Sequence, residues 1–204
     1  MNPIWSATGK LVCPCMREQA HGQAELAHGT RRPHEVLPEP LIKSGLTRNQ
    51  VEGGETMADV KIEPLGPGET ALLADLFNQV ISPARDEEFF RRRFQGRHNV
   101  CILLASLAGR PVGFTAGFEL KPATYFSWIA GVLPDYRRQG IATQLIQGLQ
   151  AWAQDHHYSI LRFECLNQHR PMLHVAIAED FDLVGIRWDT TSANNVAIFE
   201  KDLR

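Results

Sequence analysis

From about residue 57 to the C-terminus, hydrophobic and polar positions recur with the regular periods of strands and helices. Residues 60–65 (VKIEPL) have the pattern of a short strand, and residues 69–81 have that of a helix. The apolar side chains of this helix share one face: Leu72, Leu73, Leu76, Phe77 and Val80. A second helix is predicted over residues 84–96, because acids fill its first turn, arginines fill its last, and Gly96 supplies a C-terminal stop.

The middle of the chain predicts antiparallel strands that lead into a helix. Residues 99–109 and 111–120 are strand-like, and Gly109 lies where a hairpin between them would turn. Residues 124–133 have a third strand pattern. An apolar stripe at helical spacing follows over residues 141–154, so this helix is expected to pack on the sheet.

The C-terminal part predicts a strand, a helix and a closing hairpin. The strand covers residues 160–165, and the helix lies within residues 171–179. The hairpin strands cover residues 183–188 and 195–203. The total is about seven strands and about four helices in mixed α/β (α+β) order, within one domain over residues 57–204.

Residues 1–56 sustain neither period, so we expect a disordered or non-native N-terminal extension. Cys13 and Cys15 are followed by widely spaced histidines, namely His21, His28 and His34. This spacing matches no closed zinc site, and we expect no metal. An alternative is that Met57 is the natural start, because MADVKIEPL opens like the first strand of a domain.

Composition adds limits on the partners. The chain has 204 residues, 44% of them apolar and 22% charged, with a net charge of -2. This balance favours neither nucleic acid nor an anionic membrane as a partner. No apolar run approaches the ~20 residues of a membrane span, and no secretion signal opens the chain, so we expect a cytoplasmic protein. Cys101 and Cys165 lie in strand-like runs and are expected to be free thiols.

The stretch VLPDYRRQGIATQL, residues 132–145, joins a strand to a helix. The first amides of a helix have no partners within it and favour an anion. Gly140 lets the backbone approach a ligand closely, and Arg137 and Arg138 add positive charge. The stretch therefore predicts an anion site, although a surface turn with two solvated arginines has the same local pattern.

The order of residues in this stretch excludes two common phosphate loops. It has neither the Gly-Lys-Ser/Thr ending of a nucleotide triphosphate loop nor the Gly-x-Gly-x-x-Gly of a dinucleotide fold. RRQGIA instead reads Arg-x-x-Gly-x-Ala, counted from Arg137. It resembles the acyl-CoA motif of the GCN5-related N-acetyltransferase (GNAT) superfamily, and the element order of residues 60–204 is similar to that of this family.

The resemblance implies a mixed, mostly antiparallel sheet that splays at a central parallel strand pair. Here the pair would be residues 124–133 and 160–165, with acetyl-CoA in the gap. The implied backbone contacts to the pantetheine and thioester come from Val132 and Leu133, and the Val132 amide would also face the developing oxyanion. The implied pyrophosphate site consists of Arg137, Arg138, Gln139, Gly140, Ile141, Ala142 and Thr143. Asn167 would touch the cofactor arm, or would be a simple turn residue.

The resemblance also implies a proton acceptor for the attacking amine, often a carboxylate or a water chain. Strand alternation places Glu119 beside Thr115 and Gly117, with room around it. Glu164 shares a face with Arg162 and reads as an ion-pair partner. We therefore favour Glu119 over Glu164 as the base, although either carboxylate also fits a solvated strand position.

The leaving-group acid is where the sequence departs from the family pattern, which often has a tyrosine about seven residues beyond the asparagine. Counting seven from Asn167 gives His174, which could donate a proton. Aligning the end of the helix by Phe181 instead gives Ala176, with Asp180 at the usual glycine. Both registers stay open, as does a water in this role.

The resulting prediction is an acetyl-CoA-dependent N-acetyltransferase acting on a primary amine. The acceptor is not specified, although the acids at residues 86–88 would attract a cation or simply favour a helix start. The alternative is a catalytically silent acetyl-CoA-binding or sensing module, which the missing tyrosine favours. A homodimer is possible by analogy with the family.

Overall fold

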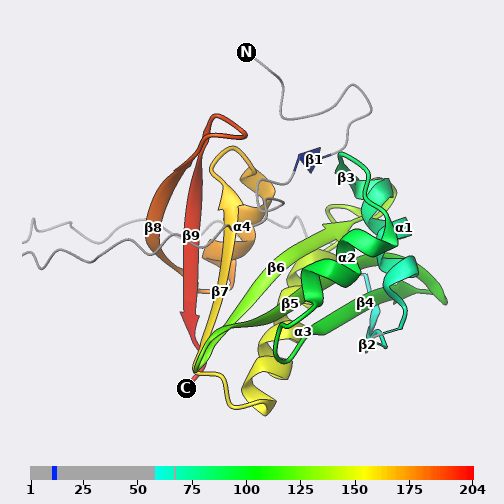
Figure 1. Ribbon diagram of the computed structural model, residues 1–204, viewed down its shortest axis with the longest axis horizontal. Coiled ribbons are helices and arrows are strands. Elements are labelled where there is room, and N and C mark those ends of the chain that lie inside the picture. Colours follow the sequence, from blue (N-terminus) through cyan, green and yellow to red (C-terminus); the bar gives the residue numbers. More distant parts are fainter. Residues whose placement is uncertain (1–10, 13–57, 67) are drawn as a thin grey trace, which may run out of the picture. The chain divides into compact units, whose positions relative to one another are not determined.

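The computed structural model describes residues 11–12, 58–66 and 68–204 (Figure 1). The expectations for the N-terminal extension, its cysteines and Met57 therefore lie outside the described residues, apart from strand β1 (Leu11–Val12). This strand pairs in parallel with β3 (Ile81–Ser82), which follows the first helix directly. In the part of the chain that the structure describes, no helix is both long and apolar enough to cross a membrane.

The main sheet has seven strands in the order β2-β4-β5-β6-β7-β9-β8. The strands are β2 (Lys61–Pro64), β4 (Cys101–Leu107), β5 (Arg110–Lys121), β6 (Thr124–Val132), β7 (Ile160–Leu166), β8 (Asp182–Asp189) and β9 (Asn194–Asp202). All neighbouring strands are antiparallel except β6 and β7, which are parallel. The predicted fold, mostly antiparallel with a central parallel pair, is confirmed.

Four α-helices lie among the described residues: α1 (Thr70–Val80), α2 (Glu87–Phe94), α3 (Ile141–Asp155) and α4 (Arg170–Ala178). α2 begins later than predicted because Asp86 caps it, its side chain accepting a hydrogen bond from the Phe89 N–H at 2.8 Å. A short 3-10 helix, η2 (Pro134–Tyr136), which was not predicted, connects β6 to the start of α3.

Two hydrophobic clusters separate the helices into pairs. Leu73 and Phe77 of α1 and Phe90 of α2 pack with Phe114 and Trp128 of the sheet. The second cluster joins α3 and α4 to the sheet through residues such as Leu145, Leu149, Ala176, Phe163 and Phe199. Helices therefore bury both faces of the central strands, which explains why these strands are apolar at successive positions.

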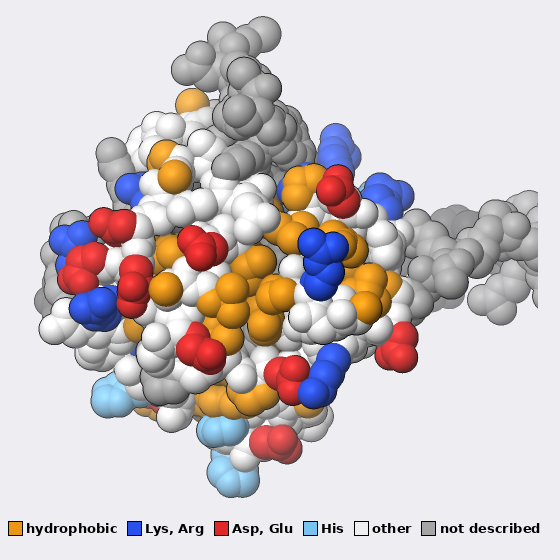
Figure 2. All heavy atoms as spheres, turned by 90° about the vertical axis from the view of Figure 1, so that its right-hand side faces the viewer, with side chains coloured by type: hydrophobic (Ala, Val, Ile, Leu, Met, Phe, Trp, Pro, Cys, Tyr) orange, Lys and Arg blue, Asp and Glu red, His pale blue; other side chains and the backbone are white. Residues whose placement is uncertain are grey.

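The surface beside the first helices carries mixed charge. Figure 2 shows acidic and basic side chains interspersed around hydrophobic ones on the side that faces right in Figure 1. On α2, Glu87 and Glu88 form ion pairs with Arg91, and Glu88 forms another with Arg92. The acids expected to attract a cation thus have partners within their own helix.

The parallel pair separates along its length. Pairing runs only from Thr124 with Ile160 to Ser127 with Phe163. β6 continues to Val132 along β5, while β7 continues to Leu166 along β9. The predicted splay is confirmed, and it opens the centre of the sheet.

Candidate active site

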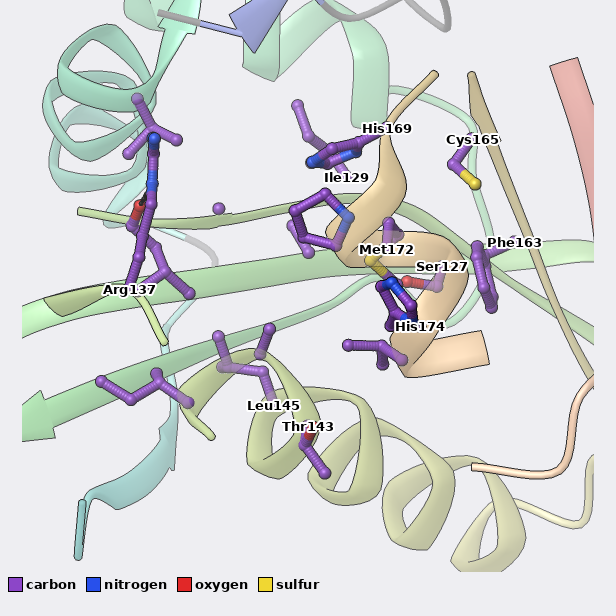
Figure 3. A pocket seen from close by; sticks show the side chains of 18 of the residues that line it. Ser127, Ile129, Arg137, Thr143, Leu145, Phe163, Cys165, His169, Met172 and His174 are labelled. Atoms are coloured by element: carbon purple, nitrogen blue, oxygen red, sulfur yellow. Dashed lines mark hydrogen bonds between the residues drawn. The ribbon is translucent and has the colours of Figure 1, made fainter. Parts of the chain in front are cut away.

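A cavity of about 550 Å³ lies where β6 and β7 separate. Its walls come from β6, the loop into α3, β7 and α4 (Figure 3). Eight of the residues predicted for the site line it: Val132, Arg137, Arg138, Gly140, Ile141, Ala142, Thr143 and His174. All residues of the stretch RRQGIAT except Gln139 therefore face the same cavity as the helix after β7.

The start of α3 forms one wall and is held firmly. Ile141 and Leu145 are each 1% exposed and anchor the first turns against the sheet. Gly140 caps the helix at φ 73°, in the left-handed region that favours glycine. A side chain at this position would strain the turn that presents the first amides of α3.

Arg137 connects this loop to the end of β6. Its Nε donates a hydrogen bond to the Val132 carbonyl oxygen at 3.1 Å. Burial lowers the pKa of the guanidinium from its usual value, but an arginine still carries its charge at neutral pH. Arg138 also lines the cavity but is exposed, so solvent screens its charge more than that of Arg137.

The backbone groups of Leu133 already have partners within the protein, so its expected contact to the cofactor stays a prediction. Its N–H donates to the Val112 oxygen on β5 at 2.9 Å, and its carbonyl accepts from the Tyr136 N–H at 2.9 Å. Leu133 does not line the cavity. Because backbone groups alternate in direction along a strand, Val132 directs its N–H to the other side, where β7 no longer pairs.

Gln139 and Asn167 are not among the cavity-lining residues. The Gln139 carbonyl accepts a hydrogen bond from the Ala58 N–H at 3.0 Å, which connects the loop before α3 to the segment that precedes β2. Asn167 is exposed just beyond β7, and its N–H donates to the Asn195 oxygen at 2.9 Å. Their expected contacts to a cofactor stay predictions.

The ranking of the two carboxylates is not supported by their positions. Glu119 does not line the cavity; it pairs with Tyr125 at the far end of β6 from Val132. Its Oε2 accepts a hydrogen bond from the Tyr158 hydroxyl at 2.7 Å. Strand alternation predicted the face of Glu119 but not its place along the strand. Its role as base thus stays a prediction without a geometric argument.

Glu164 does line the cavity, but its oxygens are engaged. Oε1 accepts from Arg162 at 2.9 Å, and Oε2 accepts from Arg187 at 2.9 Å. The Glu164 side chain is only 14% exposed. The ion pair with Arg162 was expected, and the second arginine from β8 was not.

The structure distinguishes the two registers considered for α4. His174 lines the cavity together with Pro171, Val175 and Ala178, which are spaced as one helix face. Ala176 is fully buried in the hydrophobic cluster and does not line the cavity. His174, and not Ala176, therefore occupies the position from which a side chain reaches the cavity (Figure 3).

Sequence reasoning missed four polar residues of the lining: Ser127, Tyr136, Cys165 and His169. Tyr136 lies within the stretch VLPDYRRQGIATQL, so its position next to Arg137 could have indicated that it belongs to the site. His169 precedes α4 in a loop without periodicity, which gave no signal. Burial and the charge of Arg137 both lower the pKa of His169, whereas burial raises the pKa of Cys165 to about 12.

Comparison with known protein families agrees with this geometry. The model of the acetyltransferase (GNAT) family matches residues 70–179, from α1 to the end of α4. The matched range contains the whole lining of the cavity. The chain belongs to the acetyltransferase (GNAT) family, as the motif and element order predicted.

Solved structures share the fold at low sequence identity. The ribosomal-protein-S18-alanine N-acetyltransferase from Escherichia coli superposes with a TM-score of 0.61 and 16% identity, covering 71% of this chain and 94% of that one. A putative acetyltransferase from Salmonella typhimurium with its cofactor acetyl-CoA gives 0.58 and 12%, covering 71% and 94%. A GNAT acetyltransferase from Elizabethkingia anophelis with acetyl-CoA bound gives 0.56 and 16%, covering 70% and 97%. A search of curated proteins gave no match.

Proposed function

We propose that the protein is an acetyl-CoA-dependent N-acetyltransferase that transfers the acetyl group to a primary amine. The separation of β6 and β7 beyond Ser127 and Phe163 carries this proposal. Because of this separation, backbone groups at the end of β6 face the cavity. Another wall of the cavity is the start of α3, which Arg137 and Arg138 precede. This combination suits a ligand that has an extended amide-containing arm and an anionic end.

The donor set fits acetyl-CoA at both ends. The pyrophosphate would bind the first amides of α3, from Gly140 to Thr143, with Arg137 beside them. The pantetheine arm would follow the free edge of β6 and pair with Val132. The putative acetyltransferase from Salmonella typhimurium and the GNAT acetyltransferase from Elizabethkingia anophelis, both with acetyl-CoA, support the choice of ligand.

In the transfer step, the neutral amine nitrogen forms a bond to the acetyl carbon, and the carbon–sulfur bond breaks. The Val132 N–H would stabilise the negative charge that develops on the carbonyl oxygen; one such donor is worth ~2.7–4 kcal/mol in other acyl transfers. The thiolate of CoA leaves and accepts a proton from His174 or from water. The amine loses its proton to water, since Glu164 already accepts from two arginines.

His174→Gln tests the proton donor. The variant keeps a polar side chain on the exposed face of α4 but cannot supply an acidic proton at neutral pH. We expect kcat to fall by ~10²-fold or more if His174 acts as general acid, with acetyl-CoA affinity retained. Unchanged kcat at saturating acceptor would assign the proton to water.

A second candidate is a catalytically silent acetyl-CoA-binding module, which the absence of a tyrosine from the α4 face of the cavity favours. Calorimetric titration with acetyl-CoA, followed by a thiol-release assay on a panel of small amines, polyamines, peptides and lysine side chains, separates the two. Enzyme activity predicts release of CoA with at least one acceptor. Binding without release for every class of amine supports the module.

A further inference from the structure

We propose that His169 is a second anion-binding side chain of this cavity, and that it takes up a proton when the pyrophosphate of acetyl-CoA binds beside Arg137. Affinity for the cofactor would thereby depend on pH. The inference rests on the proposed function, because it assumes that acetyl-CoA occupies the cavity.

Hydrogen bonds hold the backbone of His169 in place, but its imidazole ring does not cap helix α4. Its N–H donates to the Leu166 oxygen at 2.9 Å, and its carbonyl accepts from the N–H groups of Met172 and Leu173. His169 is the N-cap residue of α4, but its side chain makes no capping hydrogen bond. The ring is directed into the cavity from the α4 side, as Figure 3 shows.

The ring therefore shares the cavity with Arg137, which comes from the opposite wall. Two features of the surroundings, burial first and the charge of Arg137 second, lower the pKa of His169 from its ordinary value. In the free protein, the imidazole is consequently neutral at physiological pH. A neutral ring limits the repulsion between these two side chains.

Other titratable groups also face the cavity from each of its walls: Tyr136, Arg138, Glu164, Cys165 and His174. Glu164 is held in ion pairs with Arg162 and Arg187, so its charge is balanced locally. Burial raises the pKa of Cys165 to about 12, so this thiol is uncharged at neutral pH. The charge of Arg137 is thus the one that acts most clearly on His169.

A bound pyrophosphate would reverse the electrostatic effect on the pKa of His169. Its negative charge next to Arg137 would offset the repulsion and favour the imidazolium form, so the pKa of His169 would be higher in the complex than in the free protein. Between these two pKa values, binding takes up a proton. Affinity then rises as the pH falls through the bound-state value, by up to about tenfold for each unit of difference, and becomes constant below the free-state value.

Calorimetric titration of the full chain with acetyl-CoA at pH 6 to 8, in buffers of different ionisation enthalpy, measures this proton uptake directly. His169→Asn removes the titrating group and keeps a residue type that is favourable at an N-cap. His98→Gln is the matched control, because His98 is exposed and does not line the cavity. The titration of acetyl-CoA itself is common to all proteins tested, so the difference between them isolates the histidine.

We expect proton uptake in the wild type and in His98→Gln, and its loss in His169→Asn together with most of the pH dependence of affinity. His169→Gln provides a second variant, and circular dichroism of each variant verifies the fold. Equal proton uptake in the wild type and in the folded His169 variants would overturn the inference while leaving the proposed function intact. Failure of acetyl-CoA to bind any of the proteins would overturn both.

Discussion

At the scale of single residues, the two adjacent arginines of the motif differ in environment. Arg137 is half-buried and bonded to the end of β6, whereas Arg138 is exposed. A charge fixed in a partly buried position contributes more to anion binding than a solvated one, which water and salt screen. The sequence alone presents them as equivalent.

Arg137→Gln should therefore weaken acetyl-CoA binding much more than Arg138→Gln. Loss of a charge-assisted hydrogen bond is worth about 1.5–3 kcal/mol, which is about tenfold or more in Kd. Titrations with acetyl-CoA at low and high salt provide the measurement. Equal losses for the two variants would show that only the net charge of the loop matters.

The residue scale also shows where sequence reasoning fails. Glu119 lies in a strand as predicted, whereas Leu133 lies just beyond the end of β6, and neither residue lines the cavity. The register of β5 with β6 decides whether Val132 or Leu133 directs its N–H to the gap. This register shifts at a bulge between Ala116 and Gly117. A bulge reverses the alternation of side chains and leaves no clear signal in the hydrophobic pattern.

At the scale of elements, β6 depends on close approach to its neighbour β5. A Cβ on Gly131 would lie 2.8 Å from two ring carbons of Phe114, which is fully buried. Gly131 also lines the cavity. The absence of a side chain at Gly131 thus makes room for the Phe114 ring, next to the cavity.

Gly131→Ala should lower the free energy of unfolding by about 1–3 kcal/mol, because the buried ring cannot move away freely. Urea denaturation with a fluorescence readout provides the measurement. Gly68→Ala is a suitable control, since a Cβ there meets nothing within 4 Å. A loss at Gly131 no larger than that at Gly68 would contradict the packing argument.

The elements themselves were largely predictable, because long apolar runs and helical stripes mark the central strands and α3. The position of His174 was predictable only as one of two registers. A helix of nine residues gives too short a stripe to decide which face meets the cavity, and packing of Ala176 in the core decides it. The short helix η2 and strand β3 were missed, since neither is long enough to show a period.

At the scale of the described part of the molecule, the sheet lies between two hydrophobic clusters, and its centre opens where β6 and β7 separate. Cys101 and Cys165 are buried, at 4% and 6% exposure, in the cluster beneath α3. Burial raises the pKa of each thiol to about 12. Both cysteines therefore report on the integrity of this core.

Iodoacetamide at pH 8 should modify Cys101 and Cys165 at least ~10²-fold more slowly in the native protein than in the unfolded chain, because the reactive thiolate is rare and shielded. Mass spectrometry of the peptides that contain each residue provides the rates. Since folding raises these pKa values, the thiols also make the fold less stable as the pH rises above ~8.5. Rapid native labelling would contradict the burial of these side chains.

The central claim is that acetyl-CoA lies between β6 and β7 with its pyrophosphate at the start of α3. A crystal structure of the complex with acetyl-CoA tests it most directly. We predict pyrophosphate oxygens within hydrogen-bonding distance of amides between Gly140 and Thr143, and the thioester carbonyl facing the Val132 N–H. Acetyl-CoA bound at another surface, or a pantetheine arm that does not follow β6, would contradict the account.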